Sequence, residues 1–107
     1  MKLTGICETL RDFDGNEYHD TDKQPLTFKA AMIKALNAGH DGYEKPDGNA
    51  KLERYRIAKR LHDSGDDTEC TADEIVLIKK LVGWMYIPAV SGQFYEWIES
   101  TGGKDNE

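Results

Sequence analysis

Cysteine and histidine side chains are well suited to bind metals or to act as nucleophiles, and this chain has few of them. It contains two cysteines, Cys7 and Cys70, and three histidines, His19, His40 and His62. None of them has the Cys-x-x-Cys or His-x-x-x-His spacing that is typical of a zinc site. Neither cysteine stands in a nucleophile signature. The sequence therefore predicts no catalytic residue, no metal site and no cofactor, and we expect a protein that is not an enzyme.

Acidic residues and glycines are plentiful, yet neither set forms a catalytic or phosphate-binding motif. The paired carboxylates Asp66-Asp67 and Asp73-Glu74 fall in a predicted loop and in the first turn of a predicted helix. Solvation and the helix dipole favour acids at such positions, whereas general acid–base catalysis needs carboxylates desolvated in a cleft. The ten glycines include no Gly-x-Gly-x-x-Gly and no Gly-Lys-Ser/Thr sequence, so we expect no nucleotide-binding loop.

The residues best suited to bind a partner are arginines and large aromatic side chains, which anchor many protein interfaces. We select six candidate partner-binding residues: Arg56, Arg60, Trp84, Tyr86, Tyr95 and Trp97. Arg56 and Arg60 lie one turn apart on a predicted helix, so they either contact an acidic partner or form a solvated face with Glu53. Tyr95 and Trp97 lie about 200° apart around a helix. One helix face cannot bury both, and we expect at least one of the aromatic side chains near the surface.

The elements that position these residues begin with a β-hairpin and a loop in residues 1–25. Three apolar residues lie among small and polar ones, which favours a strand: Leu3, Ile6 and Leu10. The Asp14-Gly15 pair supplies the positive-φ positions of a tight turn. Residues 12–16 also resemble a calcium loop, but their glycine stands at position 4 instead of 6 and Lys23 stands at position 12. The turn is the preferred interpretation.

The rest of the chain predicts helices. The first follows the N-cap Thr27 and ends near residues 37–39, and the second covers about residues 50–62. Its apolar side joins the following residues: Leu52, Tyr55, Ala58 and Leu61. Residues 39–49 and 63–69 read as loops.

The third predicted helix, residues 71–86, begins with the capping box Thr71-Ala72-Asp73-Glu74 and is apolar around more than half of its circumference, so it should be central. A last helix begins at Pro88 or Ser91. The predicted fold is therefore α+β and mostly helical, with an N-terminal β-hairpin packed on a three- to four-helix core.

Length and composition are typical of one soluble domain. The chain has 107 residues, 38% hydrophobic and 32% charged. We expect a single domain over residues 1–99 (hairpin and loop in 1–25, helices in 26–99) and a flexible tail over 100–107. The net charge of −6 argues against direct nucleic-acid binding. The sequence shows neither a membrane-spanning run nor a signal peptide, and its two distant cysteines favour reduced thiols, so we expect a cytoplasmic protein.

Several segments, which together cover most of residues 3–99, carry a family resemblance. They are Phe13-Asp14-Gly15-Asn16, Leu26-Thr27-Phe28-Lys29-Ala30-Ala31, Thr71-Ala72-Asp73-Glu74 and Ile78-Lys79-Lys80-Leu81-Val82-Gly83, followed by Pro88 and Gly92-Gln93. In their order and lengths they resemble small, mostly uncharacterised accessory proteins of tailed bacteriophages and prophages. The resemblance implies a phage origin and a protein that acts by contacting others, and it carries over no active site.

The expected function is therefore that of a non-enzymatic phage or prophage accessory protein, a protein–protein interaction module for another phage or host protein. Assembly fits within this function, either as a homo-oligomer or within a virion or chaperone complex, in the host cytoplasm or on the virion. The alternative is an acidic host-directed inhibitor that competes for a nucleic-acid-binding site on a host enzyme. Such a mimic needs its acids on one face, whereas here they are spread over several loops and diluted by lysines.

Overall fold

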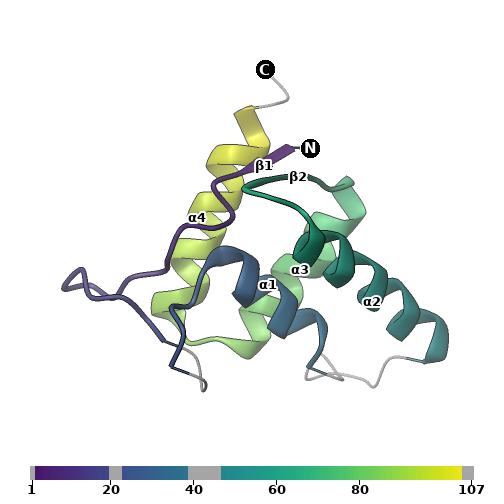
Figure 1. The fold of residues 1–107 in the computed structure, drawn as a ribbon, viewed down its shortest axis with the longest axis horizontal. Helices are drawn as coiled ribbons and strands as arrows, with labels where there is room; N and C mark the ends of the chain where they lie inside the picture. The colour runs from purple at the N-terminus through teal and green to yellow at the C-terminus, as the bar shows by residue number, and fades with distance from the viewer. Residues whose placement is uncertain (1, 20–22, 39–46, 105–107) are drawn as a thin grey trace.

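The fold is given by a computed structural model that describes residues 2–19, 23–38 and 47–104, with residues 101–104 described as backbone only. The elements follow the chain in this order: β1 (Lys2–Thr4), α1 (Phe28–Leu36), α2 (Gly48–Asp63), β2 (Asp67–Glu69), α3 (Ala72–Met85) and α4 (Pro88–Lys104). The predicted α+β, mostly helical class is therefore confirmed. α2 lies at one end of the long axis, and the loop that follows β1 projects from the other end (Figure 1).

Side chains that satisfy free backbone amides explain where three of the helices begin. The Thr27 hydroxyl accepts a hydrogen bond from the amide three residues on, at 3.0 Å, and the predicted capping box of α3 forms between Thr71 and Glu74. The carboxylate of Asp47 caps α2 in the same way, at 2.8 Å. Because of this third cap, α2 begins at Gly48, two residues before the predicted start.

The predicted turn near Asp14-Gly15 is present. One carboxylate oxygen of Asp12 accepts hydrogen bonds from the amides of Asp14 and Asn16, both at 2.9 Å, and Gly15 has a φ of +87°. Arg11 and Glu17 face each other in an isolated antiparallel bridge. The N-terminal hairpin is thus a tight turn closed by single bridges, and the Asp12 carboxylate is occupied by backbone donors.

A regular two-stranded sheet forms between β1 and β2, in a register that pairs Leu3 with Thr68. The sequence predicted a solvated loop where β2 lies, because three residues are too few to show a period of two. In the sheet, Thr68 is buried while its neighbours Asp67 and Glu69 are exposed. The sheet therefore joins the beginning of the described chain to the connection between α2 and α3.

The core forms where the four helices meet the N-terminal segment. The residues with side chains that are almost fully buried include Leu3, Ile6, Leu10, Met32, Ile57, Leu61, Ile78, Leu81, Val82 and Phe94. α3 contacts both α1 and α4, which agrees with the predicted central position of this helix. Its apolar surface is wider than its buried face, however, because Val76 and Met85 remain exposed.

α2 turns a different face to the core than the sequence predicted. Leu52 and Tyr55 are exposed, and Arg54 is buried instead, with Ile57, Ala58 and Leu61. Both stripes have helical spacing, so periodicity alone does not choose between them. An arginine can occupy the buried stripe because its three methylene groups pack like an apolar side chain.

α4 begins at Pro88, the earlier of the two predicted starts. It continues to Lys104, past the boundary at residue 99 after which a flexible tail was expected. The first part of α4 also binds the hairpin. The side-chain amide of Gln93 donates a hydrogen bond to the carbonyl of Arg11 at 2.7 Å and accepts one from the backbone amide of Arg11 at 3.2 Å.

Candidate protein-interaction surface

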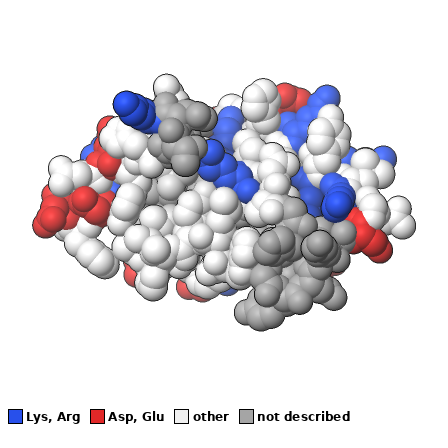
Figure 2. Space-filling model, turned by 90° about the horizontal axis from the view of Figure 1, so that it is seen from below, with Lys and Arg blue, Asp and Glu red and all other residues white. Residues whose placement is uncertain are grey.

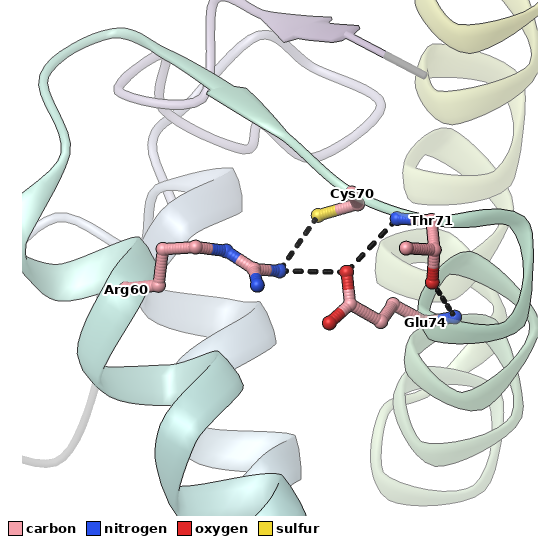
Figure 3. Close-up of polar contacts among 4 residues, drawn as sticks. All are labelled: Arg60, Cys70, Thr71 and Glu74. Carbon is pink, nitrogen blue, oxygen red and sulfur yellow. Dashed lines mark hydrogen bonds and ion pairs between the residues drawn. The ribbon is translucent and has the colours of Figure 1, made fainter.

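Arg60, one of the six candidate residues, is engaged inside the molecule. Its Nη2 donates to the Glu74 carboxylate at 2.7 Å and lies 3.8 Å from Sγ of Cys70 (Figure 3). The same Glu74 oxygen accepts the amide of Thr71 at 2.9 Å, so the capping box and the ion pair share one carboxylate. Arg60 therefore links α2 to the beginning of α3.

This network also sets the protonation of its acidic members. Desolvation disfavours the charge on Glu74, but the hydrogen bonds from Arg60 and Thr71 outweigh it, and the pKa of this carboxyl is lowered. Burial raises the pKa of the Cys70 thiol, and the nearby Arg60 only partly offsets that effect. Cys70 is therefore a protonated, buried thiol at neutral pH and a poor nucleophile.

The other two arginines of α2 differ from Arg60 and from each other. Arg56 is exposed and makes no hydrogen bond or ion pair with any other residue that the structure describes. Arg54 is only 8% exposed, and its Nε and Nη1 have no hydrogen-bond partner within the described ranges. The sequence analysis did not select Arg54, and only the packing of α2 reveals its burial.

Tyr95 and Trp97 lie on either side of the buried Phe94, and both make internal contacts. The Tyr95 hydroxyl donates to the carbonyl of Lys79 in α3 at 2.7 Å. The Trp97 ring stacks on Phe28 at 4.3 Å between centroids, and its Nε1 donates to the carbonyl of Thr4 at 3.1 Å. These two aromatic residues hold α4 against its neighbours.

The remaining candidates, Trp84 and Tyr86, lie where α3 turns into α4. Trp84 is 40% exposed, which meets the expectation that at least one of the aromatic side chains reaches the surface. Two apolar neighbours that the sequence analysis did not select are also exposed, Met85 at 40% and Ile87 at 60%. We call Trp84, Met85 and Ile87 the α3–α4 corner. The corner exists because Ile87 precedes Pro88 and leaves the helical conformation.

Tyr86 points inward from this corner and packs against the core. With Met85 it lines a cleft of about 610 Å³ whose other walls come from the end of α1 and the segment before it. The lining residues are His19, Leu26, Lys34, Asn37, Ala38, Met85 and Tyr86. The view from below, toward the α3–α4 turn, shows a broad uncharged area with Lys and Arg side chains mainly above it and acidic groups toward the edges (Figure 2).

The described residues offer little else that could bind a ligand. Among them, no group of three or more His, Cys, Asp or Glu side chains is placed to hold a metal ion. His40 and most of the loop predicted over residues 39–49 lie outside the described residues. Cys7 is exposed, Cys70 is buried and both are free thiols. In the described part of the chain, no helix has the length and apolar character needed to cross a membrane.

Comparisons with known proteins add no functional residue to this surface. No protein-family model matches the sequence, and searches of curated proteins and of solved structures also return no match.

Proposed function

We propose that this chain is a non-enzymatic accessory protein of a tailed bacteriophage or prophage and that it binds another phage or host protein through the α3–α4 corner. The observation that carries the binding role is the exposure of three large apolar side chains at one turn: Trp84, Met85 and Ile87. Single exposed apolar residues are common on protein surfaces, whereas adjacent ones at a rim of polar residues mark interaction sites. The phage origin rests on the sequence resemblance alone.

The cleft beside the corner strengthens this assignment. Its lining combines the apolar side chains of Leu26 and Ala38 and the ring of Tyr86 with the polar side chains of His19 and Lys34. A partner that covers the corner can therefore insert an apolar side chain next to it and reach polar groups at the edge. The mainly apolar character of this contact predicts binding that survives high salt.

The test is capture of partners from a lysate of the source cells with the tagged protein, at low and at high salt, with mass spectrometry as readout. The variant Met85→Ser/Ile87→Ser should lose any partner that the wild-type protein keeps at high salt. The matched control is Val76→Ser, which changes another exposed apolar residue of α3 away from the corner. Circular dichroism must show that both variants remain folded.

Two outcomes would contradict the proposal. Equal loss of the partner in Val76→Ser would show that the corner is not the binding surface. Capture of a nucleic-acid enzyme that is released at high salt, and that both variants still bind, would favour the acidic inhibitor instead.

A further inference from the structure

Half of the basic residues of this acidic protein lie on two neighbouring helices, α1 and α2. α1 and α2 together carry seven Lys and Arg residues against two acidic ones, a formal charge of +5, and the rest of the chain carries seven against eighteen, or −11. Blue side chains gather on the upper and right-hand parts of Figure 2, the side on which α2 lies, whereas red ones appear at both ends of this view. The hairpin turn, with Asp12, Asp14 and Glu17 beside Arg11, is acidic and therefore complementary in charge to the basic α2.

A groove between α1 and α2 opens on the basic side. It has a volume of about 240 Å³ and is lined by Ile33, Asn37, Tyr55, Ala58, Lys59 and His62. Tyr55 is 57% exposed. Lys59 is also exposed and has no ion pair with another residue in the described ranges. The groove thus combines apolar lining residues with a cation, Lys59, that pairs with no acidic residue in the described part of the chain.

The hairpin presents the opposite combination at the other end. Phe13 is 95% exposed, the most exposed of the large hydrophobic side chains that the structure describes. It stands between Asp12 and Asp14 at a turn that the Asp12 carboxylate holds in shape. Nη1 of Arg11 donates a hydrogen bond to the carbonyl of Gly15 in the same turn, at 3.0 Å. The backbone carbonyl of Arg11 accepts a hydrogen bond from the side chain of Gln93. The ring of Phe13 is therefore displayed on a preformed acidic arm.

We propose that Phe13 of one copy inserts into the α1–α2 groove of a second copy, with the acidic turn facing Lys59. A cavity of about 150 Å³ accepts a benzene ring, so the groove is large enough for the side chain of Phe13. The arm and α2 project from opposite ends of the long axis, which measures 40 Å, so the contact joins different molecules. This self-association goes beyond the proposed function and uses none of the corner residues.

The geometry of this contact has a consequence for assembly. The arm and the groove are different surfaces, so the interface is heterologous, and each copy keeps a free arm and a free groove after the first contact. Association therefore continues head to tail into a ring or a chain instead of stopping at a symmetric dimer. Because a single anchor side chain gives weak binding, the association should be measured at protein concentrations from about 10 µM to about 1 mM.

The test is the average molar mass, measured by sedimentation equilibrium across that range. The average molar mass of the wild-type protein should increase with concentration, and the increase should be smaller at high salt. Phe13→Ser removes the anchor and Lys59→Glu reverses the rim charge, so each variant alone should associate at least about tenfold more weakly. Mixing the two should restore association, but only to heterodimers, because one variant supplies an intact groove and the other an intact arm.

Two further variants sharpen the result. Asp14→Lys/Lys59→Glu exchanges the charges within one chain and should recover part of the association lost in Lys59→Glu. Val76→Ser changes an exposed side chain outside both surfaces and should behave as wild type.

A wild-type protein that stays monomeric throughout would overturn the proposal and leave the groove to some other partner. Association that Phe13→Ser leaves unchanged, or that Met85→Ser/Ile87→Ser abolishes instead, would also overturn it. Neither result would bear on binding of a foreign protein at the corner, which the lysate experiment tests separately.

Discussion

Replacing Gly83 by alanine should destabilise the protein, although alanine is the better helix former. Gly83 lies in α3 beneath the ring of Tyr95 from α4, and the Tyr95 hydroxyl donates to the carbonyl of Lys79. A methyl group at position 83 would overlap the Tyr95 oxygen and lie 3.3 Å from the ring carbon that bears it. The ring must therefore move, and the hydrogen bond to α3 is lost or weakened.

The expected magnitude follows from opposing effects. Alanine in a helix interior stabilises by about 1 kcal/mol relative to glycine. Crowding a packed contact costs about 1–3 kcal/mol, and the lost hydrogen bond costs about 1 kcal/mol more. We expect Gly83→Ala to lower the free energy of unfolding by about 1–3 kcal/mol. A change of about 1 kcal/mol corresponds to roughly 4–8 °C in Tm for a domain of this size.

The assay is urea unfolding followed by circular dichroism, with two comparisons. In the background Tyr95→Phe the clashing oxygen is gone, so Gly83→Ala should become neutral or stabilise by up to about 1 kcal/mol. The control Gly92→Ala places a methyl group in α4 where no atom lies within 4 Å, and it should stabilise by a similar amount. If Gly83→Ala stabilises the wild-type protein as Gly92→Ala does, Tyr95 does not lie over Gly83.

Two further predictions concern the network around Arg60. The pKa of Glu74 is lower in the folded protein than in the unfolded chain, where it is about 4.3. The charge of Glu74 therefore stabilises the fold above that unfolded-state pKa. This stabilisation is lost as the pH falls through the pKa of Glu74 in the folded protein. Glu74→Gln keeps a capping-box residue but loses the ion pair with Arg60. Urea unfolding should therefore show a free energy of unfolding lower than that of the wild type by about 0.5–1 kcal/mol near pH 7 and almost unchanged near pH 2. A difference between variant and wild type that does not change with pH would contradict the assignment. The exposed Cys7 should react quickly with a thiol reagent and Cys70 only after unfolding, since burial raises the Cys70 pKa; equal rates in the folded protein would show that Cys70 is accessible.

The features that the sequence predicted are those encoded within a few residues. The caps at Thr27 and Thr71, the turn at Asp14-Gly15 and the start of α4 at Pro88 each depend on neighbours along the chain. The central position of α3 also followed from its own composition. Local signals were therefore enough for the fold class and for most of the helix starts.

The features that the sequence missed depend on distant partners. β2 becomes a strand only because β1 lies beside it, and the buried face of α2 is chosen by α1, against which this helix packs. The candidate site divides in the same way. Tyr95 and Trp97 proved to contact α3 and β1, and Met85 and Ile87 became candidates only when the packing left them uncovered.

The position of β1 affects how the chain can fold while it is being synthesised. Residues 2–4 pair with 67–69, and Thr4 accepts a hydrogen bond from Trp97, 93 residues further on. At about 5–20 residues per second, a ribosome needs roughly 3–13 s to make β2 after β1. During that interval β1, with its buried side chain Leu3, lacks both β2 and α4, which contact it in the folded protein. A nascent chain of this protein must therefore keep its first apolar segment soluble until α4 has emerged.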